Sequence, residues 1–247
     1  MSVSRTICLG FLGTIAVGTL LLMLPIATSD GSWNNFIVAL FTATSATCVT
    51  GLIVVDTGTY YSNIGEFIIL FLIQIGGLGY MSATTFLLLV LGHKFRLRDK
   101  MALQQTLDTP GLSGVVQLLK SIVAITMLFE LTGAFALIPI FYRDFPPRES
   151  IWLGVFHSIS AFNNAGFSLF ADSLMGYVNS VPLNIVVCLL VIFGGLGYQT
   201  IVDLYNWLRL ILTRTNRRLN FSLHFKIVTT TTLFLLFLGT VVVWISE

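Results

Sequence analysis

Two short stretches of small and polar residues, each between long apolar segments, are the parts of this chain whose residue types suggest chemistry. The first covers residues 41–52, and the second covers 156–167, 115 residues later. Both have Phe, Ser-Ala and Gly at matching places, the glycines being Gly51 and Gly166. Glycine adopts backbone angles closed to other residues, and carbonyl oxygens in a narrow path can replace an ion's hydration shell. The pattern therefore predicts ion coordination by backbone oxygens.

Other landmarks repeat around these stretches. Gly-Gly-Leu-Gly-Tyr follows each of them, at 76–80 and at 194–198, and an apolar segment ending near Pro25 or Pro139 precedes each. Self-similarity over so long a period indicates a duplicated unit. Small residues let membrane helices approach closely. We therefore interpret six glycines of the pentapeptides as helix-packing positions: Gly76, Gly77, Gly79, Gly194, Gly195 and Gly197.

The composition is that of a membrane protein. The chain is 55% hydrophobic and 10% charged, with a mean hydropathy of +0.90, whereas soluble domains carry about 25% charged residues. The first apolar run, after Arg5, is too long for a typical signal peptide, and we expect it to be retained as a helix. We predict an all-α polytopic membrane protein whose surroundings are lipid, with no nucleic-acid partner and no metal or disulfide pattern among its three cysteines.

The apolar segments differ in length, and this difference predicts the topology. Two of them, 33–46 and 151–162, are shorter than the roughly 17 residues needed to cross a bilayer. We interpret each as a re-entrant helix followed by extended chain, between two full spans. Full spans are expected at about 6–27, 64–92, 121–142, 181–208 and 227–245. The expected organisation is a first unit at 1–92, a loop at 93–120, a second unit at 121–208, a loop at 209–226, and the first helix of a third unit at 227–247.

The basic residues predict which side faces the cytoplasm. With the N-terminus and both loops on one side, that side holds 11 of the 13 basic residues, and only Arg143 and Arg148 fall opposite. Cytoplasmic loops carry such an excess, so we expect a cytoplasmic N-terminus. The short helices must not count as crossings for this arrangement. Both units then have the same orientation, as in parallel repeats around a central path.

The short helices also predict the sign of the ion. Each enters from the outside, so its partially negative C-terminal end points toward the middle of the membrane and favours a cation. The acidic residues expected outside can raise the local cation concentration. The residues predicted to form the filter are Thr47, Cys48, Val49, Thr50 and Gly51 in the first loop, and Asn163, Asn164, Ala165 and Gly166 in the second.

Residues 44–52, 160–167 and 76–80 resemble the Trk/Ktr/HKT superfamily of potassium transporters, in particular the bacterial Ktr membrane subunit KtrB. The resemblance implies potassium uptake through a filter of P-loop carbonyls, often with Na+ as an activator and without a covalently bound cofactor. It implies a plasma-membrane (bacterial inner membrane) homodimer, docked to a cytoplasmic RCK-type nucleotide-binding ring. Some relatives with serine at the first filter position favour sodium, so Gly51 favours potassium.

The length differs from that family pattern. A subunit of the superfamily has four M1–P–M2 units, each with a span, a re-entrant pore helix and its loop, and a second span, similar to a simple potassium-channel subunit. Four units of the present period would need roughly 450 residues. This chain has 247 residues, enough for two units and one further helix. We therefore expect it to correspond to the N-terminal half of such a transporter.

Two other classes of membrane protein would require different sequence features. A secondary transporter with broken helices, moving Na+ or a small solute, would show inverted repeats or a charged midplane site. An intramembrane enzyme would need a Ser-His pair, paired aspartates or a metal cluster at membrane depth. The histidines at 93, 157 and 224 are dispersed, so an enzyme is not expected. For Glu130, within the third span, a structural partner and an ion-pathway role both stay open.

Overall fold

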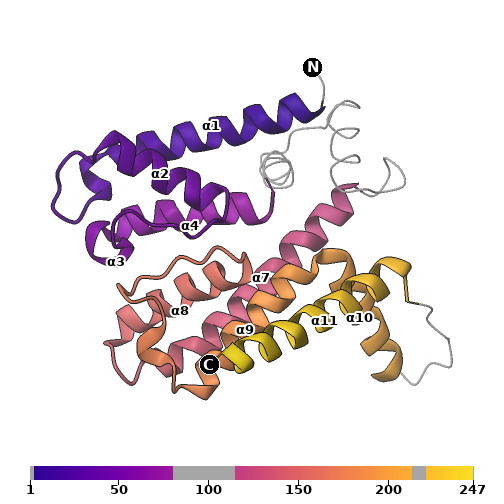
Figure 1. The fold of residues 1–247 in the computed structure, drawn as a ribbon. Helices are drawn as coiled ribbons and strands as arrows, with labels where there is room; N and C mark the ends of the chain where they lie inside the picture. The colour runs from indigo at the N-terminus through magenta and orange to yellow at the C-terminus, as the bar shows by residue number, and fades with distance from the viewer. Residues whose placement is uncertain (1–2, 80–114, 213–220, 247) are drawn as a thin grey trace. The chain divides into compact units, whose positions relative to one another are not determined.

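The computed structural model of the protein describes residues 3–79, 115–212 and 221–246 (Figure 1). These residues form helices and connecting loops, and no β-strand occurs in the described ranges apart from an isolated bridge between Thr28 and Tyr61. The chain divides into two compact units, Met1–Val191 and Ile192–Glu247. It is an all-α membrane protein, as the composition predicts.

The first repeat begins with a long helix that ends just before a proline. Asn35 caps the short helix after it by accepting a hydrogen bond from the backbone N–H of Ile37 at 2.8 Å. Ser62 caps the last helix of the repeat through the N–H of Gly65 at 3.2 Å. The elements are α1 (Val3–Met23), η1 (Pro25–Ala27), α2 (Phe36–Thr47), α3 (Thr57–Tyr60) and α4 (Asn63–Gly77).

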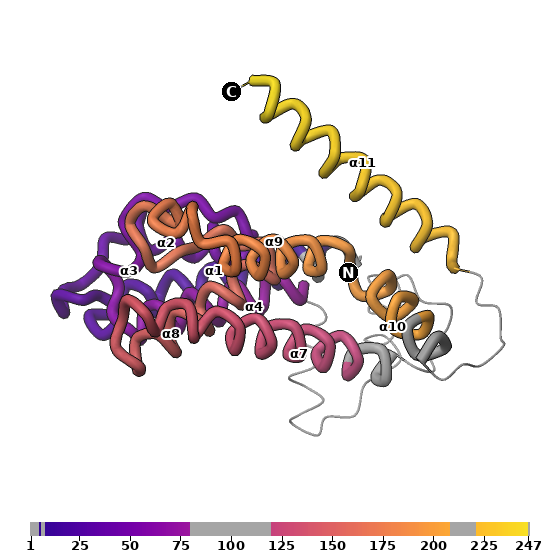
Figure 2. The backbone as a smooth tube through the Cα atoms, turned by 90° about the horizontal axis from the view of Figure 1, so that it is seen from below, coloured from indigo at the N-terminus to yellow at the C-terminus, as the bar shows by residue number. Residues whose placement is uncertain are grey.

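The second repeat has the same order of long and short helices. Its first helix includes Pro139 close to its end, and its short helix begins at Pro147, where a missing N–H is tolerated. The helices α7 and α8 lie side by side in both views (Figure 1 and Figure 2). The elements are α7 (Val115–Phe141), α8 (Pro147–Phe162), η2 (Met175–Tyr177) and α9 (Val181–Leu196).

The same three-helix contact occurs in both repeats. A Cβ atom added to Gly18 of α1 would lie 2.8 Å from a methyl group of Leu72 and 3.4 Å from Cβ of Ala43. In the second repeat, a Cβ on Gly133 of α7 would meet Leu190 at 2.7 Å and also the hydroxyl of Ser158. In each case a glycine on the first helix lets the short helix and the last helix approach closely. The contact gives a residue-by-residue correspondence between the repeats.

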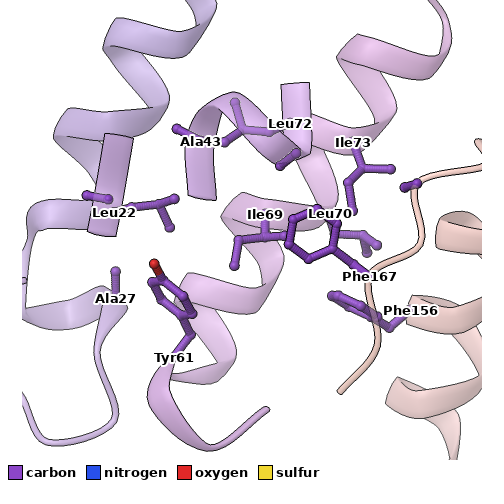
Figure 3. Packing of buried hydrophobic residues seen from close by; sticks show 13 residues of the cluster. Leu22, Ala27, Ala43, Tyr61, Ile69, Leu70, Leu72, Ile73, Phe156 and Phe167 are labelled. Carbon is purple, nitrogen blue, oxygen red and sulfur yellow. The ribbon is translucent and has the colours of Figure 1, made fainter. Parts of the chain in front are cut away.

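One buried apolar cluster joins the two repeats within the first unit. It is centred on α1, α2 and α4, and Phe156 and Phe167 of the second repeat reach the α4 side of it (Figure 3). Trp152 of α8 also donates its indole N–H to the buried carboxylate of Glu66 on α4. The short helix of the second repeat is therefore fixed against the last helix of the first.

The segment 181–208, predicted as one span, is a bent pair of helices. The helix stops at Leu196, and α10 (Tyr198–Leu212) leaves at 105° to α9. Gly197 lies at the break with φ +79°, a left-handed conformation that ends a helix and that glycine adopts without strain. In the second unit, Ser222 donates a hydrogen bond to Asp203, just before α11 (Leu223–Ser246).

Two described helices, Lys120–Phe141 and Leu223–Ser246, are long and apolar enough to cross a membrane, and the bent pair α9–α10 is a third if it counts as one span. The segment Cys8–Met23 is apolar but shorter. Residues 80–92 of the predicted second span, 93–114 of the first basic loop and 213–220 of the second lie outside the described residues.

Candidate ion-coordinating site

The two predicted filter loops have the same backbone conformation. Each follows the C-terminus of a short helix, α2 or α8, and each has two left-handed residues separated by one other residue. This conformation costs a side-chain-bearing residue energy, so its double occurrence is a specific feature of the fold. The left-handed residues are Val49 (φ 55°) and Gly51 (φ 70°) in the first loop, and Asn164 (φ 56°) and Gly166 (φ 73°) in the second.

A serine in the last turn of each short helix holds the loop that follows it. The hydroxyl of Ser45 donates to the carbonyl of Leu52 at 2.7 Å, and that of Ser160 donates to the carbonyl of Phe167 at 2.6 Å. The backbone N–H before each filter glycine also returns to the carbonyl of the same serine, at 2.9 and 2.8 Å. These bonds fold the chain back, so that the three residues between helix and glycine, together with the glycine, form a tight arch.

Most carbonyl groups of this arch accept no hydrogen bond from the described residues. Within the described ranges, no hydrogen bond is made to the carbonyl oxygens of Cys48, Val49, Thr50 or Gly51. In the second loop the same holds for the carbonyl oxygens of Asn163, Ala165 and Gly166. Backbone carbonyls at membrane depth need a partner, and a dehydrated cation is one such partner.

The two loops meet at their glycines. A Cβ atom on Gly51 would lie 2.6 Å from the carbonyl oxygen of Ala165 and 3.0 Å from Cα of Gly166. A Cβ atom on Gly166 would lie 3.4 Å from Cα of Gly51. The sequence predicted two glycines with the same role, and the fold places them against each other. There is no room for a side chain on Gly51 in this arrangement.

The other predicted filter residues lie at different depths. Thr47 is the last residue of α2 and is fully buried, and its hydroxyl has no partner in the described part of the chain. Cys48 and Thr50 are exposed, whereas Ala165 of the second loop is fully buried. The side chains of the two loops are therefore embedded differently, although their backbones match.

The first glycine pentapeptide borders both loops. A Cβ on Gly76 would overlap the carbonyl of Thr47, and one on Gly77 would overlap the side chain of Asn163. Gly79 follows the end of α4 with φ +75°, as Gly197 follows α9, and a Cβ on either would meet nothing within 4 Å. These two glycines end helices, a role that the repeat did not reveal. Gly194 and Gly195 lie in the last turn of α9.

His157 on the second short helix has two hydrogen-bonding partners. Its Nδ1 lies 2.8 Å from the carbonyl of Leu153, and its Nε2 lies 2.9 Å from the hydroxyl of Ser168. Since Nδ1 must donate to a carbonyl, Nε2 accepts from the serine in the neutral ring. The ring also stacks on Phe170 at 5.0 Å. The side chain thus fixes the descending chain after the second filter loop.

Acidic groups lie at the end of the fold where the short helices begin. The backbone N–H and hydroxyl of Ser32 hold the pKa of Asp30 below its usual value, so this exposed carboxylate stays ionised. Burial and the hydrogen bond to Asp144, at 2.9 Å, raise the pKa of Tyr177 to about 12. Asp30 therefore supplies negative charge at this end at neutral pH, and negative charge favours cations.

Metal chelation by side chains has no site in the described ranges, where no three His, Cys, Asp or Glu residues gather closely enough to hold an ion. Repeated helix pairs around carbonyl-rich loops, with negative charge at one end, define a membrane protein suited to cations. The model of the family described as "TrkH: Cation transport protein" matches residues 11–247, and the chain belongs to this family.

The curated relatives carry potassium in their names. The chain is 41% identical to the Ktr system potassium uptake protein B of Bacillus subtilis over 98% of its own length and 52% of that protein. It is 35% identical to the potassium/sodium uptake protein NtpJ of Enterococcus hirae, over 100% of this chain and 53% of the relative. It is 38% identical to the Ktr system potassium uptake protein B of Vibrio alginolyticus, over 98% and 52%. The chain thus spans about half the length of these relatives.

Proposed function

We propose that this chain supplies two of the filter walls of a potassium-uptake protein. Potassium passes down its electrochemical gradient between the carbonyl groups of Cys48–Gly51 and those of Asn163–Gly166. The observation that carries the proposal is the pair of matching loops, whose glycines meet and in which, among the described residues, no hydrogen bond is made to the carbonyls of Cys48–Gly51, Asn163, Ala165 and Gly166. Carbonyl rings of this kind select ions by replacing their hydration shell.

The identity of the ion comes from two sources. Relatives at 41%, 38% and 35% identity are named for potassium uptake, and the last is named for sodium as well. The first filter position is Gly51, which the family resemblance associates with potassium. Sodium acts as an activator in this proposal, and permeation of Na+ is the competing outcome that the experiment below distinguishes.

The placement in the membrane follows from charge. Both short helices are re-entrant, the N-terminus and the two basic loops face the cytoplasm, and the membrane is the plasma membrane. The half-helix C-termini then direct partial negative charge toward the ion. The assembled protein is a homodimer with an RCK-type nucleotide-binding ring on its inner face, where the basic loops supply positive charge for docking.

The direct test is Gly51→Asp in the full-length protein from the natural reading frame, expressed in cells that lack their own potassium uptake. A carboxylate at this position has no space beside Ala165 and adds a fixed charge to the filter. Uptake of K+ is expected to fall by at least about a hundredfold, since clash and charge together exceed roughly 3 kcal/mol. Membrane abundance is measured in parallel and should be unchanged.

Gly31→Asp is the matched control. Gly31 has the same left-handed backbone, with φ +70°, but lies in an exposed loop with nothing within 4 Å of an added Cβ. This variant should transport K+ as the parent does. Parental K+ uptake by Gly51→Asp, at normal abundance, would overturn the filter assignment. Parental protein that moves Na+ and not K+ would support the sodium alternative.

A further inference from the structure

The side chain of Asn163, at the start of the second filter loop, is held by contacts with three helices. We call this set of contacts the polar clamp. Its amide nitrogen donates to the carboxylate of Glu130 on α7 at 3.0 Å and to the carbonyl of Ile159 at 2.9 Å. The amide oxygen of Gln74 on α4 lies 3.4 Å away. The side-chain oxygen of Asn163 occupies the space that a Cβ on Gly77 would need. Asn163 thus has fixed neighbours on three helices.

Glu130 is an unusual partner because it is a carboxylate in apolar surroundings. Its side chain is buried, with 6% exposure, and none of the described residues forms a salt bridge with it. It borders a groove of about 300 Å³ between α4 and α7, lined mainly by apolar residues such as Phe67, Phe71 and Met127. A buried carboxylate without a basic partner is costly, and amide donors are its remaining stabilisation.

The helix around Glu130 is anchored to the same short helix. The hydroxyl of Ser158 on α8 donates to the backbone carbonyl of Glu130 at 2.7 Å. Phe129 stacks on Phe162, the last residue of α8, with ring centroids 5.5 Å apart. The carboxylate therefore acts on Asn163 from a helix that is itself fixed to α8, and a displacement of α7 would be transmitted to the loop.

The first repeat has no counterpart of this clamp. The matched contacts of Gly18 and Gly133 align Glu130, three residues before Gly133, with Ile15, three residues before Gly18. The residue that aligns with Asn163 is Cys48, which is exposed. Among the described residues the polar clamp is present at one of the two loops, so the shared backbone conformation does not require it.

We propose that Glu130 is a positioning residue that sets the preference for K+ over Na+ by holding Asn163 and, through it, the carbonyl groups of the second filter loop. This inference rests on the proposed function. Loss of the clamp frees the first residue of the arch, so its carbonyl groups can close on the smaller Na+ ion. The expected consequence is a change in selectivity at nearly constant abundance.

The test measures K+ and Na+ uptake of four variants of the full-length protein in vesicles from cells lacking other K+ uptake. Glu130→Gln keeps an oxygen acceptor and should retain the parental K+/Na+ ratio within about threefold. Glu130→Ala removes it and should lower the ratio roughly tenfold. Asn163→Asp places two carboxylates together and should lower it at least as much. In Asn163→Asp combined with Glu130→Gln, donor and acceptor are exchanged, and the ratio should rise again.

Glu66→Gln is the control for a buried carboxylate that holds α8 elsewhere, through Trp152, and it should leave the ratio unchanged. A parental ratio in Glu130→Ala, or a double variant no better than Asn163→Asp alone, would overturn the inference. If Glu130→Ala does not reach the membrane, the comparison of Asn163→Asp with the double variant decides. Failure of the parent to transport K+ would instead overturn the proposed function.

Discussion

The two filter loops have one backbone and two different supports. Their left-handed residues, and the serine bonds that close the arch, correspond closely. Their side chains do not correspond, since Cys48 is exposed where Asn163 is bound by Glu130, and Thr50 is exposed where Ala165 is buried. The backbone that we propose to bind the ion is thus the same in both loops, whereas the side chains around it differ.

This difference follows from the chemistry proposed for the loops. If carbonyl oxygens bind the ion, the side chains of the loops need only hold the backbone, and several solutions are equivalent. The first loop is held by the tight contact of Gly76 with the Thr47 carbonyl, and the second by polar contacts to α4 and α7. Substitutions at the shared features should affect both loops, whereas substitutions at the divergent residues should affect one loop.

The largest effect is expected where the loops meet. Gly51→Ala brings a Cβ to 2.6 Å from the Ala165 carbonyl and also strains a left-handed residue, whereas Gly166→Ala brings one to 3.4 Å from Gly51, an ordinary contact. The strain alone costs roughly 1–2 kcal/mol, a factor of about 5–30. Gly166→Ala should therefore lower K+ uptake about tenfold, and Gly51→Ala several times more. Equal loss in both variants would mean that the loops do not meet as described.

The divergent position should show a smaller and one-sided effect. Asn163→Ala removes the amide that binds Glu130 and leaves a buried carboxylate with fewer donors. We expect a roughly tenfold lower K+/Na+ uptake ratio. Cys48→Ala removes a thiol from an exposed position and should change the ratio less than twofold. The ratio of uptake rates at equal external concentrations checks both, and a larger loss in Cys48→Ala would contradict the asymmetry.

The smallest effects are expected at the two serines, and they should be similar, because Thr50, which also donates to the Ser45 hydroxyl at 3.0 Å, keeps the backbone carbonyl of that residue as an acceptor. Ser45→Ala and Ser160→Ala each remove a single hydroxyl that binds a loop carbonyl, at 2.7 and 2.6 Å. A hydrogen bond of this kind contributes about 1 kcal/mol, so K+ uptake should fall about fivefold in either variant. Thermal unfolding in detergent should move by the same amount in both. A difference beyond threefold in uptake between them would show that the arches are held differently.

The sequence predicted the repeated helices and the paired glycines because both depend on local patterns. Apolar length and the glycine need for left-handed backbone are both visible in a few neighbouring residues. The break at Gly197 was not predicted, because the apolar pattern of the segment continues through it. The clamp on Asn163 was not predicted either, since Glu130 and Gln74 are 33 and 89 residues away. For Glu130, the fold favours the structural partner over the open alternative.

We propose that both loops bind the same ion. The most direct measurement is the anomalous diffraction of Rb+ bound to the full-length protein, because Rb+ substitutes for K+ and is located by its own signal. We expect a Rb+ peak in contact with carbonyl oxygens of Cys48–Gly51 and of Asn163–Gly166 together. A Rb+ peak bound elsewhere, with both loops unoccupied, would contradict it.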